Sequence, residues 1–302
     1  MKRRRSSRTA DGAAGYRGIE SFMPEDERVC YDPFAIDFLG GIYGLAAKGR
    51  YIMPIRLLKK TLVWYGEKIM PGMFGYVCGR TRYIDDCLKK CIDDGIEQLV
   101  ILGAGYDSRA YRFNELRGKI KVFEIDHPAT LKVKIGKIKR IFGNLPNHVV
   151  YAPVDFDKEK LDERLYENGY DKNLKTLFIW EGVTSFITAE AVDETMAFVA
   201  HNSGEGSSIV FDYIFNSVVD GTCDLEEVKK FKKRLERIGE PPTYGIEEGT
   251  IDEFLAERGF HKGEEVDAAF LEATYIHPID PSRQVARHYR LVHATVKPRK
   301  GS

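Results

Sequence analysis

The sequence has no excess of charge of either sign. Its 302 residues carry 46 basic and 46 acidic side chains, so the formal net charge is zero. A neutral chain has no global field that would recruit nucleic acid or an anionic membrane, and any ligand must be recognised locally. The length allows one large α/β domain or two small ones, and we expect one elaborated domain.

Long apolar runs are missing as well. No stretch approaches the roughly 20 apolar residues that a membrane-spanning helix needs, so we expect a soluble protein without a membrane partner. The N-terminus is basic from Met1 to Arg8, but the apolar core of a secretory signal does not follow it. We therefore expect a disordered basic tail over residues 1–25. A transit peptide is the alternative, and the early Asp11 and Glu20 argue against it.

Cysteines are few and form no recognisable pairs. The five cysteines are an odd number without a C-x-x-C motif, and no histidine-rich spacing joins them into a zinc site. Cys87 and Cys91 stand one helical turn apart and are expected as buried thiols. Free thiols fit a reducing compartment, so we predict a cytoplasmic protein without a bound metal.

Residues 100–109, VILGAGYDSR, join a short apolar run to two closely spaced glycines and an acid. Glycine tolerates positive φ and has no side chain, so Gly103 and Gly105 would let a ligand lie against bare backbone. Taken alone the pattern is weak, because an ordinary strand-to-helix turn with a surface acid looks the same.

A second strand end supports a nucleotide site. Residues 121–126, KVFEID, read as another short apolar strand, and Asp126 lies 23 residues after Gly103. An acid at an interval of roughly 20 residues meets ribose hydroxyls in nucleotide-binding α/β folds. Asp126 is therefore the predicted ribose ligand, and a helix N-cap before Pro128 is the structural alternative.

The third glycine of the dinucleotide-binding motif distinguishes NAD from S-adenosylmethionine as the cofactor. A dinucleotide fingerprint needs glycine at position 108, where this chain has Ser108. Asp107 precedes it, and a carboxylate there repels a pyrophosphate but suits a ligand with a cationic amino group and a sulfonium. These residues favour S-adenosylmethionine over NAD.

Strand-like apolar runs alternate with helical stretches after residue 96, as expected for βαβ units, whereas residues 30–92 have helical spacing. The predicted fold is α/β, a Rossmann-like sheet of seven mostly parallel strands with an antiparallel last strand and an N-terminal helical cover. We predict a helical layer or lid over 26–95 and a core over 96–298 that includes a substrate-region insertion at 214–248. The strands are expected near 98–103, 120–126, 148–154, 176–181, 207–213, 260–266 and 288–296, and helices near 189–200, 225–238 and 250–258.

Four motifs follow one another at predicted strand ends: LGAGYDSRAYRF at 102–113, FEIDHPAT at 123–130, VDFD at 154–157 and IWEGVTSFI at 179–187. Together they resemble the leucine carboxyl methyltransferase-like family of S-adenosylmethionine-dependent methyltransferases. The resemblance extends to GRTRYIDD at 79–86 and TYGIEEGTIDEFLAERGF at 243–260, and so covers most of residues 75–296. The motifs are specific in combination and not singly.

The resemblance implies S-adenosyl-L-methionine as the cofactor and assigns residues to it. Arg80 resembles the arginine that pairs with the methionyl carboxylate, for which a guanidinium is a planar two-pronged donor, and Arg82 is the second candidate. Gly103 and Gly105 resemble the glycines beneath the methionine and ribose. Asp126 resembles the acid that accepts both ribose hydroxyls.

Three further residues follow from the same motifs. Asp155 and Phe156 resemble an Asp-Leu pair that meets the adenine, and the Phe departs from the family at the Leu position. Glu181 resembles the acid that faces the cofactor's cationic centre or amino group. A structural acid that caps the turn at Gly182 is the alternative reading of Glu181.

The implied reaction is an in-line methyl transfer to oxygen, which depends mainly on alignment and on exclusion of water. We expect a small-molecule O-methyltransferase, and a protein C-terminal carboxyl methyltransferase is the alternative. A carboxylate acceptor needs no general base, whereas a hydroxyl needs one. We assign no catalytic residue, because no histidine has a recognisable motif. A cofactor-binding protein without transfer activity is the alternative from a different class.

Overall fold

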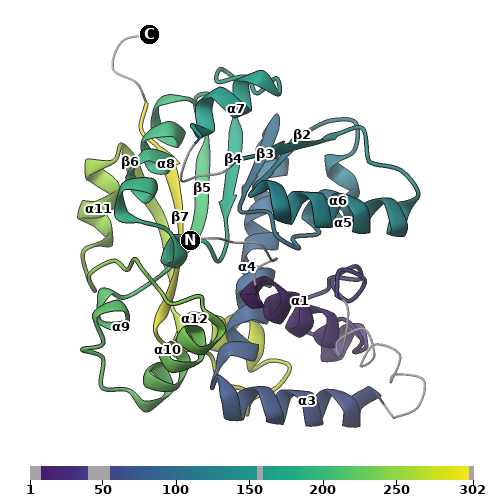
Figure 1. The fold of residues 1–302 in the computed structure, drawn as a ribbon, viewed down its shortest axis with the longest axis vertical. Helices are drawn as coiled ribbons and strands as arrows, with labels where there is room; N and C mark the ends of the chain where they lie inside the picture. Colours follow the sequence, from purple (N-terminus) through teal and green to yellow (C-terminus); the bar gives the residue numbers. More distant parts are fainter. Residues whose placement is uncertain (1–7, 40–54, 155–158, 299–302) are drawn as a thin grey trace.

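A seven-stranded sheet forms the centre of the molecule (Figure 1). The computed structural model describes residues 8–39, 55–154 and 159–298. The strands are β1 (Gln98–Leu102), β2 (Lys121–Asp126), β3 (Val149–Pro153), β4 (Thr176–Trp180), β5 (Ser208–Ile214), β6 (Phe260–Val266) and β7 (Tyr289–Val296). All seven lie where the sequence predicts them, which confirms the predicted fold class.

The strand order is β3-β2-β1-β4-β5-β7-β6. The first five strands pair in parallel, and β7 lies antiparallel between β5 and β6. β1, β4 and β5 are buried along their whole length, as expected for apolar strands covered on both faces. Parallel strands bring the residues that follow them to one edge of the sheet. The turns after β1, β2 and β4 therefore meet at this carboxyl edge.

Helices cover the sheet and one of its ends. They are α1 (Arg8–Glu20), α3 (Ile55–Ile69), α4 (Met73–Asp93), α5 (Arg109–Arg112), α6 (Pro128–Phe142), α7 (Leu161–Glu167), α8 (Ala189–His201), α9 (Asn216–Asp220), α10 (Glu226–Ile238), α11 (Ile251–Glu257) and α12 (Ala268–Leu271). α6 packs on β2 and β3, α4 contacts β4, and α11 packs on β6. α1 and α3 lie together at one end of the sheet, below it in Figure 1.

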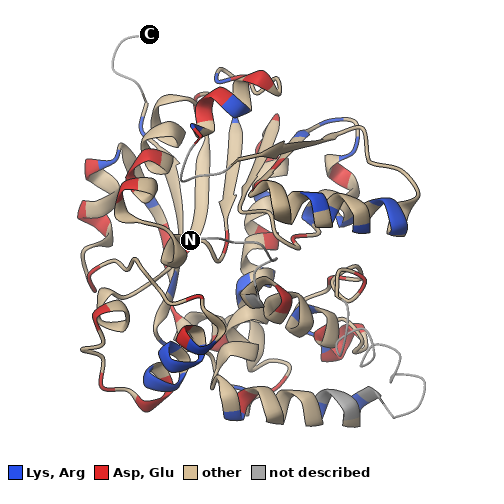
Figure 2. Ribbon diagram, in the orientation of Figure 1, with Lys and Arg blue, Asp and Glu red and all other residues tan. Residues whose placement is uncertain are grey.

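Charged residues are spread over the outer helices, and the central strands contain few of them (Figure 2). Within residues 8–39, 55–154 and 159–298, every helix is too short or too polar to cross a membrane. Among the described residues, buried charged side chains are the exception. Several of them lie at the carboxyl edge of the sheet.

The N-terminal segment differs from its prediction. The sequence predicts a disordered tail, but α1 is an ordered helix, and only residues 1–7 of that tail lie outside the described residues. Arg17 and Glu20 are 7% and 0% exposed. Arg17 pairs with Asp32 at 2.9 Å, and Glu20 pairs with Arg283 at 3.1 Å. Paired charges hold α1 together with Ala14, Tyr16 and Ile19, which pack against the core without forming a regular apolar stripe.

A close contact seats α4 against the segment that precedes β7. Gly75 lies in the first turn of α4, and a methyl group on it would lie 2.2 Å from the carbonyl oxygen of Gln284. The backbone can approach so closely only because glycine has no side chain. Arg80, a predicted site residue, follows on the same helix. The contact at Gly75 therefore helps to position Arg80.

We expect Gly75→Ala to lower the free energy of unfolding by about 1–3 kcal/mol, the usual cost of extra volume in a packed site. Gly136→Ala is the matched control, since Gly136 also lies within a helix but has open space around it. Alanine there should raise stability by roughly 0.5–1 kcal/mol. Chemical denaturation measures both variants, and equal stabilities would contradict the packing argument.

Candidate active site

Two glycines leave part of the turn after β1 without side chains. Gly103 and Gly105 have φ values of +68° and +38°, in the left-handed region that favours glycine. A Cβ on Gly103 would lie 2.3 Å from Cγ2 of Val183, in the loop after β4. The N–H of Ala104 donates to the carbonyl of Ile125 at 2.8 Å, which ties the turn to β2. A side chain at position 103 would collide with the neighbouring loop.

Asp126 faces this turn from the end of β2. Its Oδ2 accepts the N–H of Gly105 at 2.6 Å, and its Oδ1 accepts the N–H of His127 at 2.6 Å. Burial raises the pKa of the Asp126 carboxyl, and the two backbone donors offset part of that rise. The carboxyl group therefore lies against the glycine turn, where the sequence predicts a ribose ligand.

Arg80 extends from α4 to two carboxylates. Its Nη1 donates to Oδ2 of Asp212 at 2.5 Å, and its Nη2 lies 2.9 Å from Oε1 of Glu181. Glu181 directly follows β4, and Asp212 lies within β5. The three side chains are only 7%, 2% and 11% exposed for Arg80, Asp212 and Glu181. One buried guanidinium thus links a helix to two neighbouring strands.

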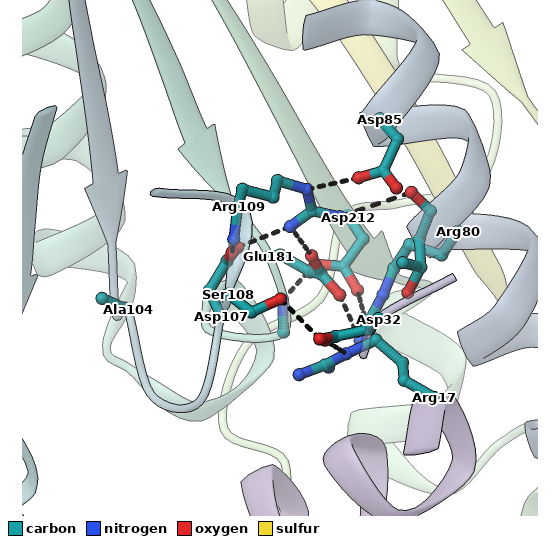
Figure 3. A network of polar contacts seen from close by, with 12 residues as sticks. Arg17, Asp32, Arg80, Asp85, Ala104, Asp107, Ser108, Arg109, Glu181 and Asp212 are labelled. Carbon is teal, nitrogen blue, oxygen red and sulfur yellow. Dashed lines mark hydrogen bonds and ion pairs between the residues drawn. The ribbon is translucent and has the colours of Figure 1, made fainter. Parts of the chain in front are cut away.

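Arg109, at the start of α5, completes this cluster (Figure 3). Its Nη1 donates to Oε2 of Glu181 at 2.6 Å and to Oδ2 of Asp107 at 2.5 Å, and its Nε donates to Oδ1 of Asp85 at 2.8 Å. Burial opposes ionisation of Glu181, but the guanidinium groups of Arg80 and Arg109 outweigh it and hold the pKa of that carboxyl well below its usual range. Glu181 is therefore a fixed negative charge.

The hydrogen-bonded network continues to the N-terminal layer. Arg112 Nη2 donates to Oδ1 of Asp85 at 2.5 Å, and Arg112 Nε donates to Oγ of Ser108 at 3.1 Å. Ser108 Oγ in turn donates to Oδ1 of Asp32 at 2.6 Å, and Asp32 pairs with Arg17 of α1. Figure 3 shows Arg17 of α1, Asp85 of α4 and Ser108 of the turn after β1 converging.

We call these nine charged residues the edge network. Four guanidinium groups face five carboxylates, so the network has one negative charge in excess. Its members are Arg17, Arg80, Arg109, Arg112, Asp32, Asp85, Asp107, Glu181 and Asp212. A buried site with this balance suits a ligand of net positive charge.

The structure brings most of the predicted cofactor residues together. Arg80, Gly103, Gly105, Asp126 and Glu181 all lie at the carboxyl edge. Asp155 and Phe156, the predicted adenine residues, lie outside the described residues. Arg82, the second candidate for Arg80's role, is 47% exposed and pairs with Asp86 at 3.1 Å.

Sequence reasoning missed three central members of the edge network, Arg109, Asp85 and Asp212. The first two lie inside the motifs LGAGYDSR and GRTRYIDD, but their importance comes from partners far away in the chain. Asp212 is the one acid in the apolar run SIVFDYI of β5. An acid inside a buried strand needs a polar or charged partner, so an isolated acid in an apolar run is the sequence signal that indicates Asp212.

Asp107 has a different role from the one that its charge suggests. Its Oδ2 accepts from the Arg109 side chain, and its Oδ1 accepts the Arg109 N–H at 2.7 Å. Its charge is therefore taken up by an arginine, and any preference for a cationic ligand rests on the whole edge network. Among the described residues, no group of three or more histidine, cysteine, aspartate or glutamate side chains is placed to hold a metal.

The histidines considered from the sequence lie elsewhere. His201, His261 and His277 are exposed. His127 serves as the N-cap of α6, where its Nδ1 accepts the N–H of Ala129 at 3.2 Å. None of these four belongs to the edge network.

Comparisons with known proteins find similarity to methyltransferases. A family model described as leucine carboxyl methyltransferase matches residues 10–200. A Bacillus subtilis (strain 168) protein named "Putative S-adenosyl-L-methionine-dependent methyltransferase YktD" is 35% identical over 162 residues, which are 54% of this chain and 53% of that protein. The match thus spans about half the length of this relative. A protein of Mycolicibacterium paratuberculosis (strain ATCC BAA-968 / K-10) with the same general name is 27% identical over 288 residues, which are 92% of this chain and 82% of that protein.

A solved structure shows the same fold. The crystal structure of a "putative methyltransferase" from Thermobifida fusca YX superposes with a TM-score of 0.52 and 14% sequence identity. The superposition covers 80% of this chain and 89% of that chain. At this identity the likeness concerns the architecture of the sheet and its helices.

We expect Glu181→Gln to lower the free energy of unfolding by about 1.5–3 kcal/mol, because it weakens the charge-assisted hydrogen bonds to Arg80 and Arg109, which keep their other carboxylate partners. Since the Glu181 pKa is depressed in the folded state, its charge stabilises the fold above the ordinary value of 4.5 and loses this effect as the pH falls further. The loss of stability below that pH should therefore be shallower in Glu181→Gln than in the wild type. Urea denaturation across the acid range measures this.

The exposed Glu253 provides the control, because Glu253→Gln changes the same chemical group without burial. Its stability and acid dependence should match those of the wild type. Similar acid dependence in wild type and Glu181→Gln would contradict the depressed pKa of Glu181.

Proposed function

The chain belongs to the leucine carboxyl methyltransferase family, and from this premise we propose that it transfers a methyl group from S-adenosyl-L-methionine to an oxygen of a small-molecule acceptor. The observation that carries the proposal is the convergence of the glycine turn, Asp126, Arg80 and Glu181 at one edge of the sheet. The names of the relatives support the choice of cofactor.

The residues at the edge fit this cofactor in charge and shape. S-adenosylmethionine carries an ammonium, a sulfonium and a carboxylate, so its net charge is positive and complements the excess carboxylate of the edge network. Gly103 and Gly105 would lie beneath its methionine and ribose, and Asp126 would accept the ribose hydroxyls. Glu181 would face its cationic groups. Asp155 and Phe156 stay proposed adenine contacts.

The role of Arg80 is more specific than the sequence suggests. Both of its terminal nitrogens already bind carboxylates, and its buried Nε has no hydrogen-bond partner. A buried donor without an acceptor is costly, and a ligand carboxylate would satisfy it. We therefore propose Nε, and not the two-pronged end of the guanidinium, as the donor to the methionyl carboxylate.

The bound cofactor would supply an electrophilic methyl group for an in-line displacement. The chain's own residues would hold the reactants in line and exclude water. α1 is placed to exclude water, because Ala10 Cβ lies 3.7 Å from the position of a Cβ on Gly105, and Arg17 Nη2 donates to the carbonyl of Tyr106 at 2.7 Å. The N-terminal helix therefore covers the glycine turn.

The edge network favours an acceptor that is already ionised. The edge network contains no histidine, and its Glu181 has a depressed pKa and is a weak base. His288 lies near Tyr289, with ring centroids 4.7 Å apart, and Tyr289 stacks on Tyr76, with ring centroids 4.1 Å apart. Burial lowers the pKa of His288 to about 3, so this imidazole is also a weak base. A carboxylate oxygen needs no base, and we propose it ahead of a hydroxyl.

The family description favours a second candidate, the terminal carboxylate of a protein. A small carboxylate and a protein C-terminus both present an ionised oxygen to the methyl group, so the edge network does not distinguish the two acceptors. A protein that binds the cofactor without transferring its methyl group is the third alternative.

We also propose a cytoplasmic location and the division of the chain into a helical layer over 26–95 and a core over 96–298.

The proposed cofactor is tested by calorimetric titration with S-adenosylmethionine, S-adenosylhomocysteine and NAD in parallel. We expect the first two to bind in the micromolar range and NAD not to bind, because a pyrophosphate would add charge to a site that already has a carboxylate in excess. Binding of NAD, or of none of the three, would overturn the proposal. Transfer of labelled methyl from S-adenosylmethionine to small carboxylic acids, to phenols and to peptides with free C-termini then separates the acceptors.

Asp126→Asn should weaken binding of S-adenosylhomocysteine by roughly 1.5–3 kcal/mol, about ten- to a hundredfold, through loss of a charge-assisted hydrogen bond. The exposed Asp93 supplies the control, since Asp93→Asn makes the same chemical change away from the carboxyl edge. Calorimetry on both variants gives the dissociation constants. An unchanged constant for Asp126→Asn would remove Asp126 from the proposed ribose site.

A further inference from the structure

Two fully buried ionisable side chains lie behind the glycine turn and have no part in the proposed contacts with the cofactor. Burial raises the pKa of one of them, Glu124, to about 7, although the neighbouring Lys134 acts in the opposite direction. Lys134 of α6 and Glu124 of β2 are each 0% exposed, and Lys134 Nζ lies 2.9 Å from Glu124 Oε1. Lysine and glutamate are rarely buried completely. A completely buried pair of this kind therefore calls for a physical reason.

Lys134 holds the backbone of the turn itself. Its Nζ donates to the carbonyl oxygen of Ala104 at 3.1 Å, and the same oxygen accepts the N–H of Asp107 at 2.8 Å. Ala104 lies between Gly103 and Gly105, whose backbones are the least restricted by sterics. The orientation of the peptide groups in the turn is consequently set by hydrogen bonds, and Lys134 supplies one of them.

Glu124 holds Lys134 in place. Its Oε2 accepts the hydroxyl of Tyr111 at 2.9 Å, and that hydroxyl lies 3.2 Å from the hydroxyl of Tyr151. Glu124 and Asp126 are two residues apart in β2, so their side chains emerge on the same side of the strand. A chain of contacts thus runs from Tyr151 through Tyr111, Glu124 and Lys134 to the carbonyl of Ala104.

Stability does not explain the pair. Desolvation of two ions costs several kcal/mol for each, and apolar residues of similar volume are often as stable as a buried ion pair or more so. What the pair does provide is a fixed direction for the peptide group between Ala104 and Gly105. The Gly105 N–H belongs to the same planar peptide group as the Ala104 carbonyl and points the opposite way, to Asp126 Oδ2 at 2.6 Å.

We propose that Lys134 and Glu124 are positioning residues that fix the glycine turn and Asp126 in the geometry that binds the nucleoside part of the cofactor. This inference rests on the proposed function. Neither side chain would touch the cofactor. The positive charge of Lys134 also lowers the pKa of Asp126 against the effect of burial, which favours the ionised form that can accept two hydroxyls.

The test is a double variant, Glu124→Gln with Lys134→Met, which removes both charges and nearly preserves volume. We expect its free energy of unfolding to equal or exceed that of the wild type. We expect its dissociation constant for S-adenosylhomocysteine to rise about ten- to a hundredfold, the range seen when supporting residues behind the ligands of metal sites are removed. Without any ligand, amide hydrogen exchange of a peptide covering residues 102–109 should become faster.

Ile138→Val is the matched control, since Ile138 is a buried residue of the same helix away from the turn. It should lower stability slightly and leave both the dissociation constant and the exchange of residues 102–109 unchanged. If the double variant does not fold, Glu124→Gln alone is measured, and it should weaken binding by a smaller factor.

The wild type is titrated first, so the two possible failures are distinguishable. A wild type that binds neither S-adenosylmethionine nor S-adenosylhomocysteine would overturn the proposed function. A wild type that binds, together with a folded variant of unchanged affinity and unchanged exchange, would overturn the positioning role and leave the proposed function intact.

Discussion

The structure depends on the compensation of charge in a place from which water is largely excluded. Arg109 and Arg80 are almost completely buried, and each must find carboxylates because an unpaired buried charge is unstable. Their partners come from α4, the turn after β1, the end of β4 and the middle of β5. The need for compensation therefore fixes how these elements meet at the carboxyl edge.

The same need to compensate buried charge holds the N-terminal helix at the site. Arg17 reaches Asp32, which accepts from Ser108 in the turn after β1. Small residues let α1 approach closely: a methyl group on Gly18 would lie 3.2 Å from the backbone nitrogen of Ile36. A helix that is anchored by charge and packed through small residues can cover the glycine turn without a regular apolar stripe.

The sequence predicts well whatever depends on neighbours in the chain. Seven strands follow from short apolar runs, and Gly103, Gly105 and Asp126 follow from their spacing after strand ends. Arg109, Asp85 and Asp212 could not be found in this way, because their significance arises from partners between 24 and 132 residues away. α1 was missed for the same reason, since its buried arginine and glutamate look like surface residues until Asp32 and Arg283 are placed beside them.

The burial of the edge network also bears on the proposed chemistry. Transfer of a methyl group from a sulfonium to a carboxylate joins a positive and a negative charge and removes both. Water stabilises the separated charges of the reactants more than the less polar transition state, so a site of low dielectric constant favours this reaction. For a hydroxyl acceptor the same burial is unfavourable, because a proton must leave and the network contains no effective base. A buried edge covered by α1 therefore supports the proposal of a carboxylate acceptor ahead of a hydroxyl.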